Sequence, residues 1–278
     1  MGMNVDCMVA VRVWCKDVLM PGSKSDLLSE RKFAERIGLL RGTMLKSYAN
    51  QTDGESGLVL LIHDRLPLKL ARKLNAAVEA EGVKADLVRW SARKEHLQTA
   101  MLKSAMKGNG FVFARTDADD LFSRYAVEDL KRMYEPGRLK VAGWRRGFHY
   151  RWGGNTLRDM QRAYKTGVFS TMQGWCVDPS LPIAAKMDPY DANHANVVKY
   201  MREELGMTRM DAAEAVVCLD GARPTPAFVW MRNRAGTPMN ASMDAPEEDL
   251  KYPETTRTPT HPQFRTLFGT DIPYDEVR

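Results

Sequence analysis

The chain has 278 residues, of which 44% are hydrophobic and 27% are charged. This composition is typical of a soluble globular protein with one large domain or two small ones. The net charge of +6 suits nucleic acid, a nucleotide diphosphate or anionic lipid equally, so charge alone does not select a partner. The sequence contains no run of 18 apolar residues, which argues against a transmembrane helix.

The four cysteines are scattered and form no CxxC pair. This spacing is unlike that of a zinc site or a disulfide framework and favours a reducing compartment. The N-terminal residues lack a basic region and a small-residue cleavage site, so we expect them to form the first strand and not a signal peptide. We therefore expect a cytoplasmic location.

Strands and helices are predicted to alternate from residue 5 to about residue 135. Apolar runs predict strands at 5–14, 57–64, 83–90 and 111–116. Apolar residues near a 3.6-residue period predict helices at 25–51, 67–82, 91–110 and 121–137. This order indicates an α/β fold with a mostly parallel sheet that is covered by helices on both faces. Such sheets bind ligands at the carboxyl ends of their strands.

The second half of the chain has a different texture. Alternating residues predict a strand or hairpin at 141–154 and a strand at 168–178. Helices are expected at 193–206 and at 208–221, and Thr208 and Asp211 at the start of the second one resemble a capping box. In the first half of the chain, Ser91 is the predicted N-cap of the helix 91–110. Beyond residue 233 the sequence is polar and rich in Pro and Thr, which favours a loosely packed arm. We predict one domain over 1–232 and a C-terminal arm over 233–278.

Three carboxylates follow the fourth predicted strand, in "FVFARTDADDLFSRY" (111–125). In an extended segment Asp117 and Asp119 point to the same side, where they repel unless a cation or a proton neutralises them. A hard divalent cation such as Mg²⁺ or Mn²⁺ would do so and would share its remaining positions with phosphate oxygens. The alternative is that Asp119 or Asp120 caps a helix that begins at Leu121.

The segment "RTDADDLFSR" (115–124) resembles the DxD motif of GT-A fold glycosyltransferases, most closely that of the putative rhamnosyltransferase family. Residues 40–67 are similar to the helix and second strand of the same fold, in which a Ser and an "NQT"-like turn precede a strand that ends in an aspartate. The resemblance runs from about residue 10 to 135. It implies a GT-A-like (Rossmann-like) sheet with a small antiparallel acceptor-side part, a hexosyltransferase-type activity and Mn²⁺ or Mg²⁺ as cofactor. The identity of the sugar does not transfer with the resemblance.

The resemblance also implies roles for individual residues. Asp117 would contact the ribose or the metal, and Asp119 would be a direct metal ligand. Asp64 would face the base or the ribose, and Arg115 would brace the site or its phosphates. His194 is the candidate for a histidine that completes the metal shell, although a place at the start of a helix explains it equally well.

An acceptor hydroxyl would then attack the anomeric carbon of the donor. If the configuration inverts, a carboxylate must accept the proton, and the candidates in the second half of the chain are Asp178, Asp191 and also Asp188. Each of them also suits a turn, and a retaining reaction stays open.

Aromatic and basic residues are interleaved in "GWRRGFHYRWGG" (143–154). Arg145 and Arg146 could bind the donor phosphates beside a platform that stacks on the acceptor sugar, or the segment could be a half-buried strand or a nucleic-acid site. We predict metal-dependent transfer from a nucleotide-diphosphate sugar to a saccharide or other hydroxyl acceptor, with peripheral contact to a membrane-borne acceptor left open. One alternative is a Mg²⁺-dependent nucleic-acid-binding or processing protein, although nucleic acid is the less favoured partner class. The other alternative is an inactive GT-A-like interaction module.

Overall fold

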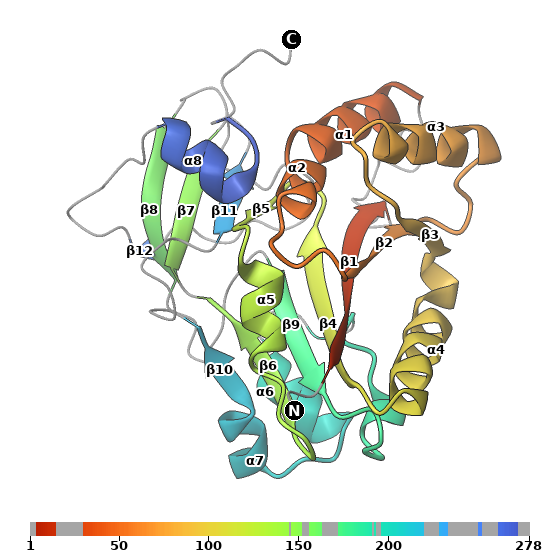
Figure 1. The fold of residues 1–278 in the computed structure, drawn as a ribbon, viewed down its shortest axis with the longest axis vertical. Coiled ribbons are helices and arrows are strands. Elements are labelled where there is room, and N and C mark those ends of the chain that lie inside the picture. The colour runs from red at the N-terminus through yellow and green to blue at the C-terminus, as the bar shows by residue number, and fades with distance from the viewer. Residues whose placement is uncertain are drawn as a thin grey trace, which may run out of the picture.

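The computed structural model describes residues 4–14, 30–144, 146–151, 156–162, 172–190, 192, 196–219, 228–232, 250–251 and 261–271. Within these ranges a central sheet has seven strands in the order β10-β6-β9-β4-β1-β2-β3 (Figure 1). Its strands are β1 (Val5–Trp14), β2 (Gly57–Ile62), β3 (Asp86–Arg89), β4 (Gly110–Asp117), β6 (Leu139–Gly143), β9 (Met172–Val177) and β10 (Val216–Cys218). Strands β1 to β4 are parallel, and β9 runs antiparallel between β4 and β6. The predicted mostly parallel α/β fold is confirmed.

Helices pack on both faces of this sheet. One face carries α1 (Glu30–Gly42), α2 (Met44–Ala49), α3 (Leu68–Glu79) and α5 (Ala126–Lys131). The other face carries α4 (Arg93–Met106), α6 (Val197–Glu203) and α7 (Arg209–Glu214). In β1, Val9 and Val11 pack against the first group of helices, while Met8 and Ala10 pack against the second. Alternate side chains are thus buried on opposite faces, which is why residues 7–11 of the strand are apolar without a break.

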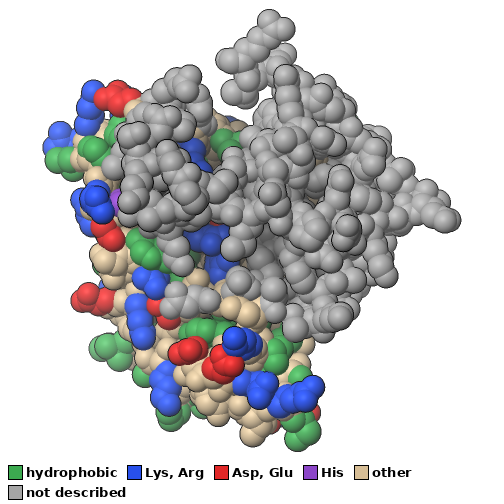
Figure 2. All heavy atoms as spheres, turned by 180° about the vertical axis from the view of Figure 1, so that it is seen from behind, with side chains coloured by type: hydrophobic (Ala, Val, Ile, Leu, Met, Phe, Trp, Pro, Cys, Tyr) green, Lys and Arg blue, Asp and Glu red, His purple; other side chains and the backbone are tan. Residues whose placement is uncertain are grey.

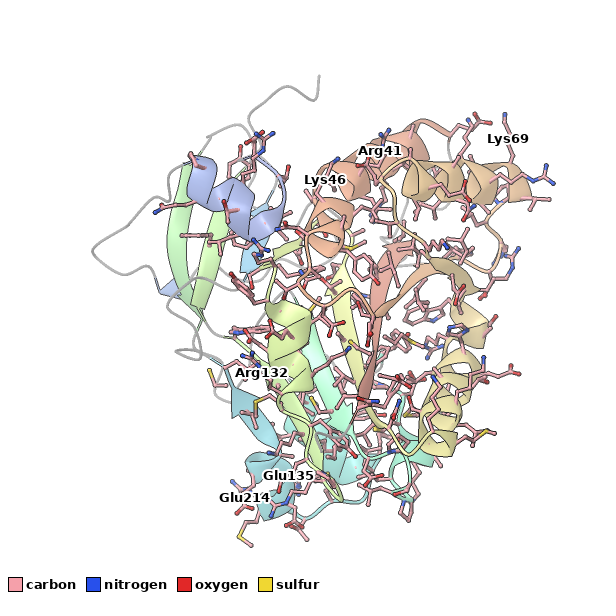
Figure 3. The ribbon with its side chains drawn as sticks, viewed as in Figure 1. Arg41, Lys46, Lys69, Arg132, Glu135 and Glu214 are labelled. Atoms are coloured by element: carbon pink, nitrogen blue, oxygen red, sulfur yellow. The ribbon has the colours of Figure 1, made fainter. Side chains whose placement is uncertain are left out.

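An ion-pair cluster links the helices of the first face. Arg41 of α1 and Lys46 of α2, labelled in Figure 3, both form ion pairs with Glu81 after α3. The Arg41 Nε to Glu81 Oε1 distance is 2.8 Å. Hydrogen bonds from these two cations lower the pKa of Glu81.

No helix in the described ranges is long and apolar enough to cross a membrane.

A second sheet adjoins the carboxyl end of β4. In the described chain it has five strands in the order β12-β8-β7-β11-β5, which are β5 (Leu121–Phe122), β7 (Arg146–Arg151), β8 (Thr156–Arg162), β11 (Phe228–Arg232) and β12 (Leu250–Lys251). Most neighbours are antiparallel, whereas β11 runs parallel to β7. Because β5 begins four residues after β4 ends, the acidic cluster lies at the junction of the two sheets.

The predicted C-terminal arm contains a packed helix, α8 (His261–Phe268). Phe264 and Phe268, four residues apart, lie on one face of α8 and are fully buried against Leu121 and Phe148 of the second sheet. The backbone N–H of Arg124 donates to the carbonyl of Leu267 at 2.7 Å. Residues 261–271 are therefore part of the packed fold, while most of 233–278 lies outside the described residues.

Four expectations for individual elements need correction. Residues 121–122 form strand β5 and not the start of a helix, and α5 begins only at Ala126. The predicted hairpin at 141–154 is divided, because β6 belongs to the central sheet and β7 to the second sheet. The predicted helix 208–221 ends in strand β10, whose residues pair with β6. Ser91 lies inside the 3₁₀ turn η1 (Trp90–Ala92) and does not cap α4.

Thr208 is the N-cap of α7, as half of the predicted capping box requires. The Thr208 hydroxyl accepts a hydrogen bond from the backbone N–H of Asp211 at 3.1 Å and donates to its carboxylate at 2.6 Å. This satisfies one of the backbone N–H groups that have no partner inside a helix.

Candidate functional site

The carboxyl ends of β1, β2 and β4 meet at one edge of the central sheet. Arg12 and Asp117 are the last paired residues of β1 and β4, and Trp14 pairs with Ile62 of β2. Asp64 follows β2 by two residues. The structure therefore brings Asp64 and the acidic cluster to the same edge, as the alternation of strands and helices predicted.

Asp117 is held by a bidentate ion pair. Nε and Nη2 of Arg12 donate to its two carboxylate oxygens at 2.6 and 2.7 Å. The two residues are register partners, so their side chains extend toward the same face of the sheet. Both side chains remain partly accessible, at 33% for Arg12 and 22% for Asp117. Sequence reasoning missed Arg12, whose only signal was a charge near the end of a mostly apolar strand.

Asp119 is almost fully buried, with 3% of its surface exposed. Burial raises the pKa of its carboxyl group to about 7, and the negative charge of Asp117 acts in the same direction. Arg36 and Arg12 oppose this rise, and Arg36 also donates to the carbonyl of Val13 at 3.1 Å. A buried carboxyl beside a second carboxylate is stabilised in its charged form by a nearby cation.

The acidic cluster does not cap a helix. No helix begins at Leu121, because residues 121–122 form strand β5, and the residue at the N-cap of α5 is Tyr125. Asp120 is 4% exposed, and its backbone N–H approaches the carbonyl of Asp117 at 3.5 Å, which marks a turn. The capping interpretation was therefore wrong.

The segment around α2 holds the backbone on both sides of the cluster. Thr43 Oγ1 donates to the carbonyl of Ala118 at 3.1 Å, and Ser47 Oγ accepts from the N–H of Phe122 at 3.4 Å. Gln51 Nε2 donates to the carbonyl of Ser123 at 2.8 Å. Ser47 and Gln51, which belong to the Ser and "NQT" features of the sequence resemblance, thus hold the turn between β4 and β5 that carries the carboxylates.

Arg115 is buried within the fold. It is 4% exposed, and its Nη1 donates to the carbonyl of Pro189 at 3.4 Å and to that of Ala192. These contacts fasten Pro189 and Ala192 to β4. They fit the bracing role inferred for Arg115 better than a direct contact with phosphate.

Asp64 is an exposed carboxylate at the same edge. It accepts hydrogen bonds from the backbone N–H and the hydroxyl of Ser91, at 3.0 and 2.7 Å. These bonds lower the pKa of Asp64, so it is ionised at neutral pH. Ser91 therefore orients a predicted site residue, although the sequence suggested that it capped a helix.

Asp178 lies at the opposite end of the sheet from the acidic cluster. It follows Val177, the register partner of Phe111 at the start of β4, whereas Asp117 ends that strand. At a rise of about 3.3 Å per residue, the strand separates the two aspartates by roughly 20 Å. Asp178 accepts from Ser180 Oγ at 2.6 Å and from the N–H of Gly137 at 2.9 Å, and these bonds lower its pKa.

Three other predicted site residues, Arg145, Asp191 and His194, lie outside the described ranges. The backbone of Arg146 is described, but its side chain is not. The described residues contain no group of three or more His, Cys, Asp or Glu that could form a metal cage. Asp117 and Asp119 still fit Mg²⁺ or Mn²⁺, because such ions use one or two carboxylates together with substrate phosphates and water.

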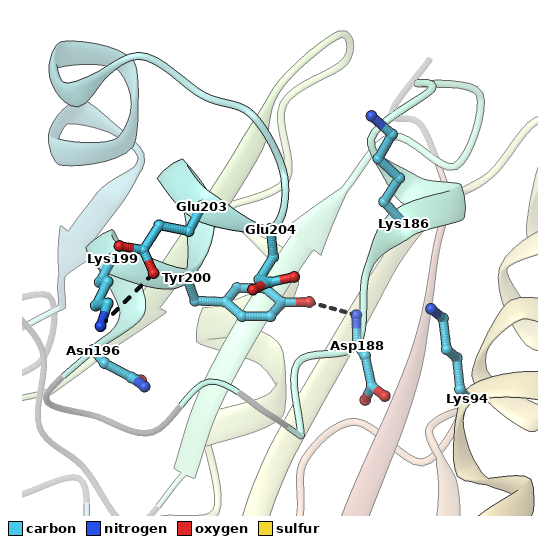
Figure 4. A pocket seen from close by; sticks show the side chains of 8 residues that line it. All are labelled: Lys94, Lys186, Asp188, Asn196, Lys199, Tyr200, Glu203 and Glu204. Carbon is cyan, nitrogen blue, oxygen red and sulfur yellow. Dashed lines mark hydrogen bonds and ion pairs between the residues drawn. The ribbon is translucent and has the colours of Figure 1, made fainter.

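A polar cavity of about 350 Å³ lies beside α4 and α6 (Figure 4). It is lined by Lys94, Lys186, Asp188, Asn196, Lys199, Tyr200, Glu203 and Glu204. The Tyr200 hydroxyl accepts from the N–H of Asp188 at 2.7 Å, and the Asp188 carboxylate pairs with Arg93 at 3.1 Å. The three lysines face three carboxylates, so this cavity has a mixed charge. It flanks the residues that Arg115 fastens.

Residues 21–204 match the model of the family described as putative rhamnosyl transferase. The chain belongs to this family. Similar solved structures include a putative nucleotide-diphospho-sugar transferase from Desulfovibrio desulfuricans G20, with 13% identity over 83% of this chain and 82% of that chain and a TM-score of 0.40. Another is the inositol-1-phosphate CTP transferase from T. maritima, with 12% identity over 84% and 86% of the two chains and a TM-score of 0.32. The search of curated proteins gave no match.

Membership of this family identifies the enzyme as a glycosyltransferase. The edge of the sheet that carries Asp64, Asp117 and Asp119 is the position at which folds of this architecture bind nucleotides.

Proposed function

We propose that this glycosyltransferase is metal-dependent and that it moves a sugar from a nucleotide-diphosphate sugar to a hydroxyl acceptor at the carboxyl edge of the central sheet. One observation carries the proposal: Asp117 at the end of β4 and the buried Asp119 two residues later have no helix to cap. A divalent cation that also binds a diphosphate would neutralise the charge of two such carboxylates. A saccharide is the acceptor class that fits the family.

The metal would be held by Asp117 and Asp119, and we propose His194 as a further ligand. When bound, the cation would neutralise the negative charge of the nucleoside-diphosphate leaving group. A bound cation would favour the ionised form of Asp119, because its positive charge would offset the burial that raises the pKa of this carboxyl group to about 7. In the metal-free protein both oxygens of the Asp117 carboxylate accept hydrogen bonds from the Arg12 guanidinium.

Other residues would position the donor and the acceptor. Asp64, ionised and oriented by Ser91, suits a hydrogen bond to a ribose hydroxyl or to the base. We propose Arg145 and Arg146 as contacts to the donor phosphates. If the reaction inverts, we propose Asp191 as the base, because Arg115 fastens its neighbour Ala192 to β4. Asp178 receives no role, since it lies at the other end of the sheet.

The nucleic-acid alternative gains no support from the described surface. On the described part of the face in Figure 2, Lys and Arg side chains lie among Asp and Glu side chains and do not form a continuous basic track. A nucleic-acid groove needs clustered cations, because affinity for the phosphate backbone comes mainly from charge.

Calorimetric titration with UDP, GDP and dTDP, in Mn²⁺ and in EDTA, tests the proposal. We expect at least one nucleotide to bind in Mn²⁺ and to lose most of its affinity in EDTA. Asp119→Ala should abolish the metal-dependent part of binding. Asp86→Ala is the matched control, because Asp86 is 76% exposed and lies at the amino end of β3. Metal-dependent binding that survives in Asp119→Ala would refute the assignment.

A further inference from the structure

Two arginines lie against the two carboxylates of the proposed metal site. Arg12 forms the bidentate pair with Asp117, and both Arg36 and Arg12 are close enough to Asp119 to counter its rise in pKa. Arg36 is anchored through the carbonyl of Val13 at 3.1 Å. The cations therefore come from β1 and α1, while the carboxylates come from the end of β4. The four side chains together carry no net charge when both carboxyls are ionised.

The pair between Arg12 and Asp117 conflicts with metal binding. Both oxygens of Asp117 accept from Arg12, at 2.6 and 2.7 Å. A divalent cation needs at least one of these oxygens as a ligand and cannot lie next to a guanidinium without strong repulsion. One of the two positive groups has to move away from Asp117.

Arg12 is partly accessible at the ligand edge of the sheet. Its side chain is 33% exposed and Asp117 is 22% exposed, and both stand at the last register position of the β1–β4 pair. Solvent that reaches both side chains weakens the attraction between them relative to that in a dry interior. The planar guanidinium that fits a carboxylate in a bidentate manner also fits a phosphate.

We propose that Arg12 is a diphosphate-binding residue that leaves Asp117 for the donor diphosphate when the metal and the donor enter together. This inference rests on the proposed function and adds a residue to it. Metal alone would displace Arg12 from Asp117 without supplying a phosphate in exchange. A nucleotide alone would compete with Asp117 for Arg12. Together they replace one ion pair with two, so the metal and the nucleotide bind with positive coupling.

Arg12→Gln separates this role from a structural one, because it should change two affinities in opposite directions. Mn²⁺ binding without nucleotide, followed by electron paramagnetic resonance at pH 8, should become about tenfold tighter, since the competing cation is lost. Binding of the nucleoside diphosphate in saturating Mn²⁺ should become about tenfold weaker, since a charged phosphate contact is lost. The coupling between the two ligands should shrink accordingly.

Arg138→Gln is the matched control, with the same charge change. Arg138 has a 67% exposed side chain, pairs with Glu135 and precedes β6 at the other end of the sheet, so both affinities should stay at the wild-type value. Arg12→Lys keeps the charge and the apolar stem, and so it provides a second folded variant. It should bind Mn²⁺ like the wild type and the nucleotide with intermediate affinity, because an ammonium cannot form the bidentate contact.

Three outcomes decide the matter. Opposite changes in Arg12→Gln support the inference. A loss of both affinities, or no change in either, overturns it while metal-dependent nucleotide binding by the wild-type protein leaves the proposed function standing. If the wild-type protein binds no nucleotide in Mn²⁺, the proposed function fails and the role of Arg12 fails with it.

Discussion

Asp119→Asn should stabilise the metal-free protein at pH 8 while it removes metal-dependent nucleotide binding. The asparagine keeps the size of the side chain and can still accept a hydrogen bond, but it places no charge at a position that is only 3% exposed. The carboxylate is costly in the empty site because it is buried next to Asp117. This cost is expected of a cation site, because the bound cation would compensate the charge of the buried carboxylate.

The magnitude follows from the pKa of Asp119. The value rises from its usual 3.8 to about 7 in the folded protein, so between these two pH values the folded state binds more protons than the unfolded state. Stability therefore falls as pH rises through this window, and the loss is complete above pH 7. This rise in the pKa of Asp119 corresponds to a loss of folding free energy on the order of 4 kcal/mol. The amide oxygen of the variant accepts a weaker hydrogen bond, so the free energy of unfolding should increase by only roughly 3 kcal/mol at pH 8.

Urea unfolding of both proteins in EDTA at pH 4, 6 and 8 measures this gain. The other carboxylates with shifted pKa values, including Asp6, Asp64 and Asp178, whose values are lowered, are common to both proteins and cancel in the difference. The free-energy difference should be near zero at pH 4 and should grow with pH. A difference that is independent of pH, or a less stable variant at pH 8, would refute the reasoning.

Three further substitutions test the packing and the site. Phe264→Ala should lower the free energy of unfolding by about 3–5 kcal/mol in urea titrations, because the ring is fully buried between α8 and the second sheet; an effect below about 1 kcal/mol would place α8 outside the cooperative fold. Gly269→Ala should lower the thermal midpoint, because a Cβ there would lie 2.6 Å from the carbonyl oxygen of Lys46 and φ is +74°; an unchanged midpoint would contradict the contact. Asp64→Asn should weaken nucleotide binding about tenfold with Mn²⁺ affinity unchanged, and an equal loss of Mn²⁺ affinity would instead make Asp64 a metal ligand.

The sequence predicted the central sheet and its ligand edge well because the signals are local. Long apolar runs and helical periods defined β1 to β4 and their helices, and parallel strands bring their carboxyl ends together whatever the details of packing. The carboxylates of "DADD" were visible at once, and so was their place after β4. Short strands were not predicted. The two residues of β5 continue a pattern that looks helical, and they form a strand because β11 pairs with them.

The partners of the carboxylates could not be predicted from the sequence. Arg12 stands 105 residues before Asp117, and only the register of β1 against β4 brings them together. Arg115 was expected to brace the site or its phosphates, but the sequence did not show that its donors are directed to the backbone carbonyls of Pro189 and Ala192. The helix α8 was hidden in a polar tail, because two phenylalanines carry its packing and their partners are far away in sequence.

The central claim is that this edge of the sheet cleaves a nucleotide-sugar donor with the help of a divalent cation. Release of nucleoside diphosphate from a panel of nucleotide sugars, followed in Mn²⁺ and in EDTA, tests it most directly. We predict release from at least one donor in Mn²⁺, loss of that release in EDTA and in Asp117→Asn, and retention in Arg138→Gln. Release at the same rate in EDTA, or in Asp117→Asn, would contradict the account.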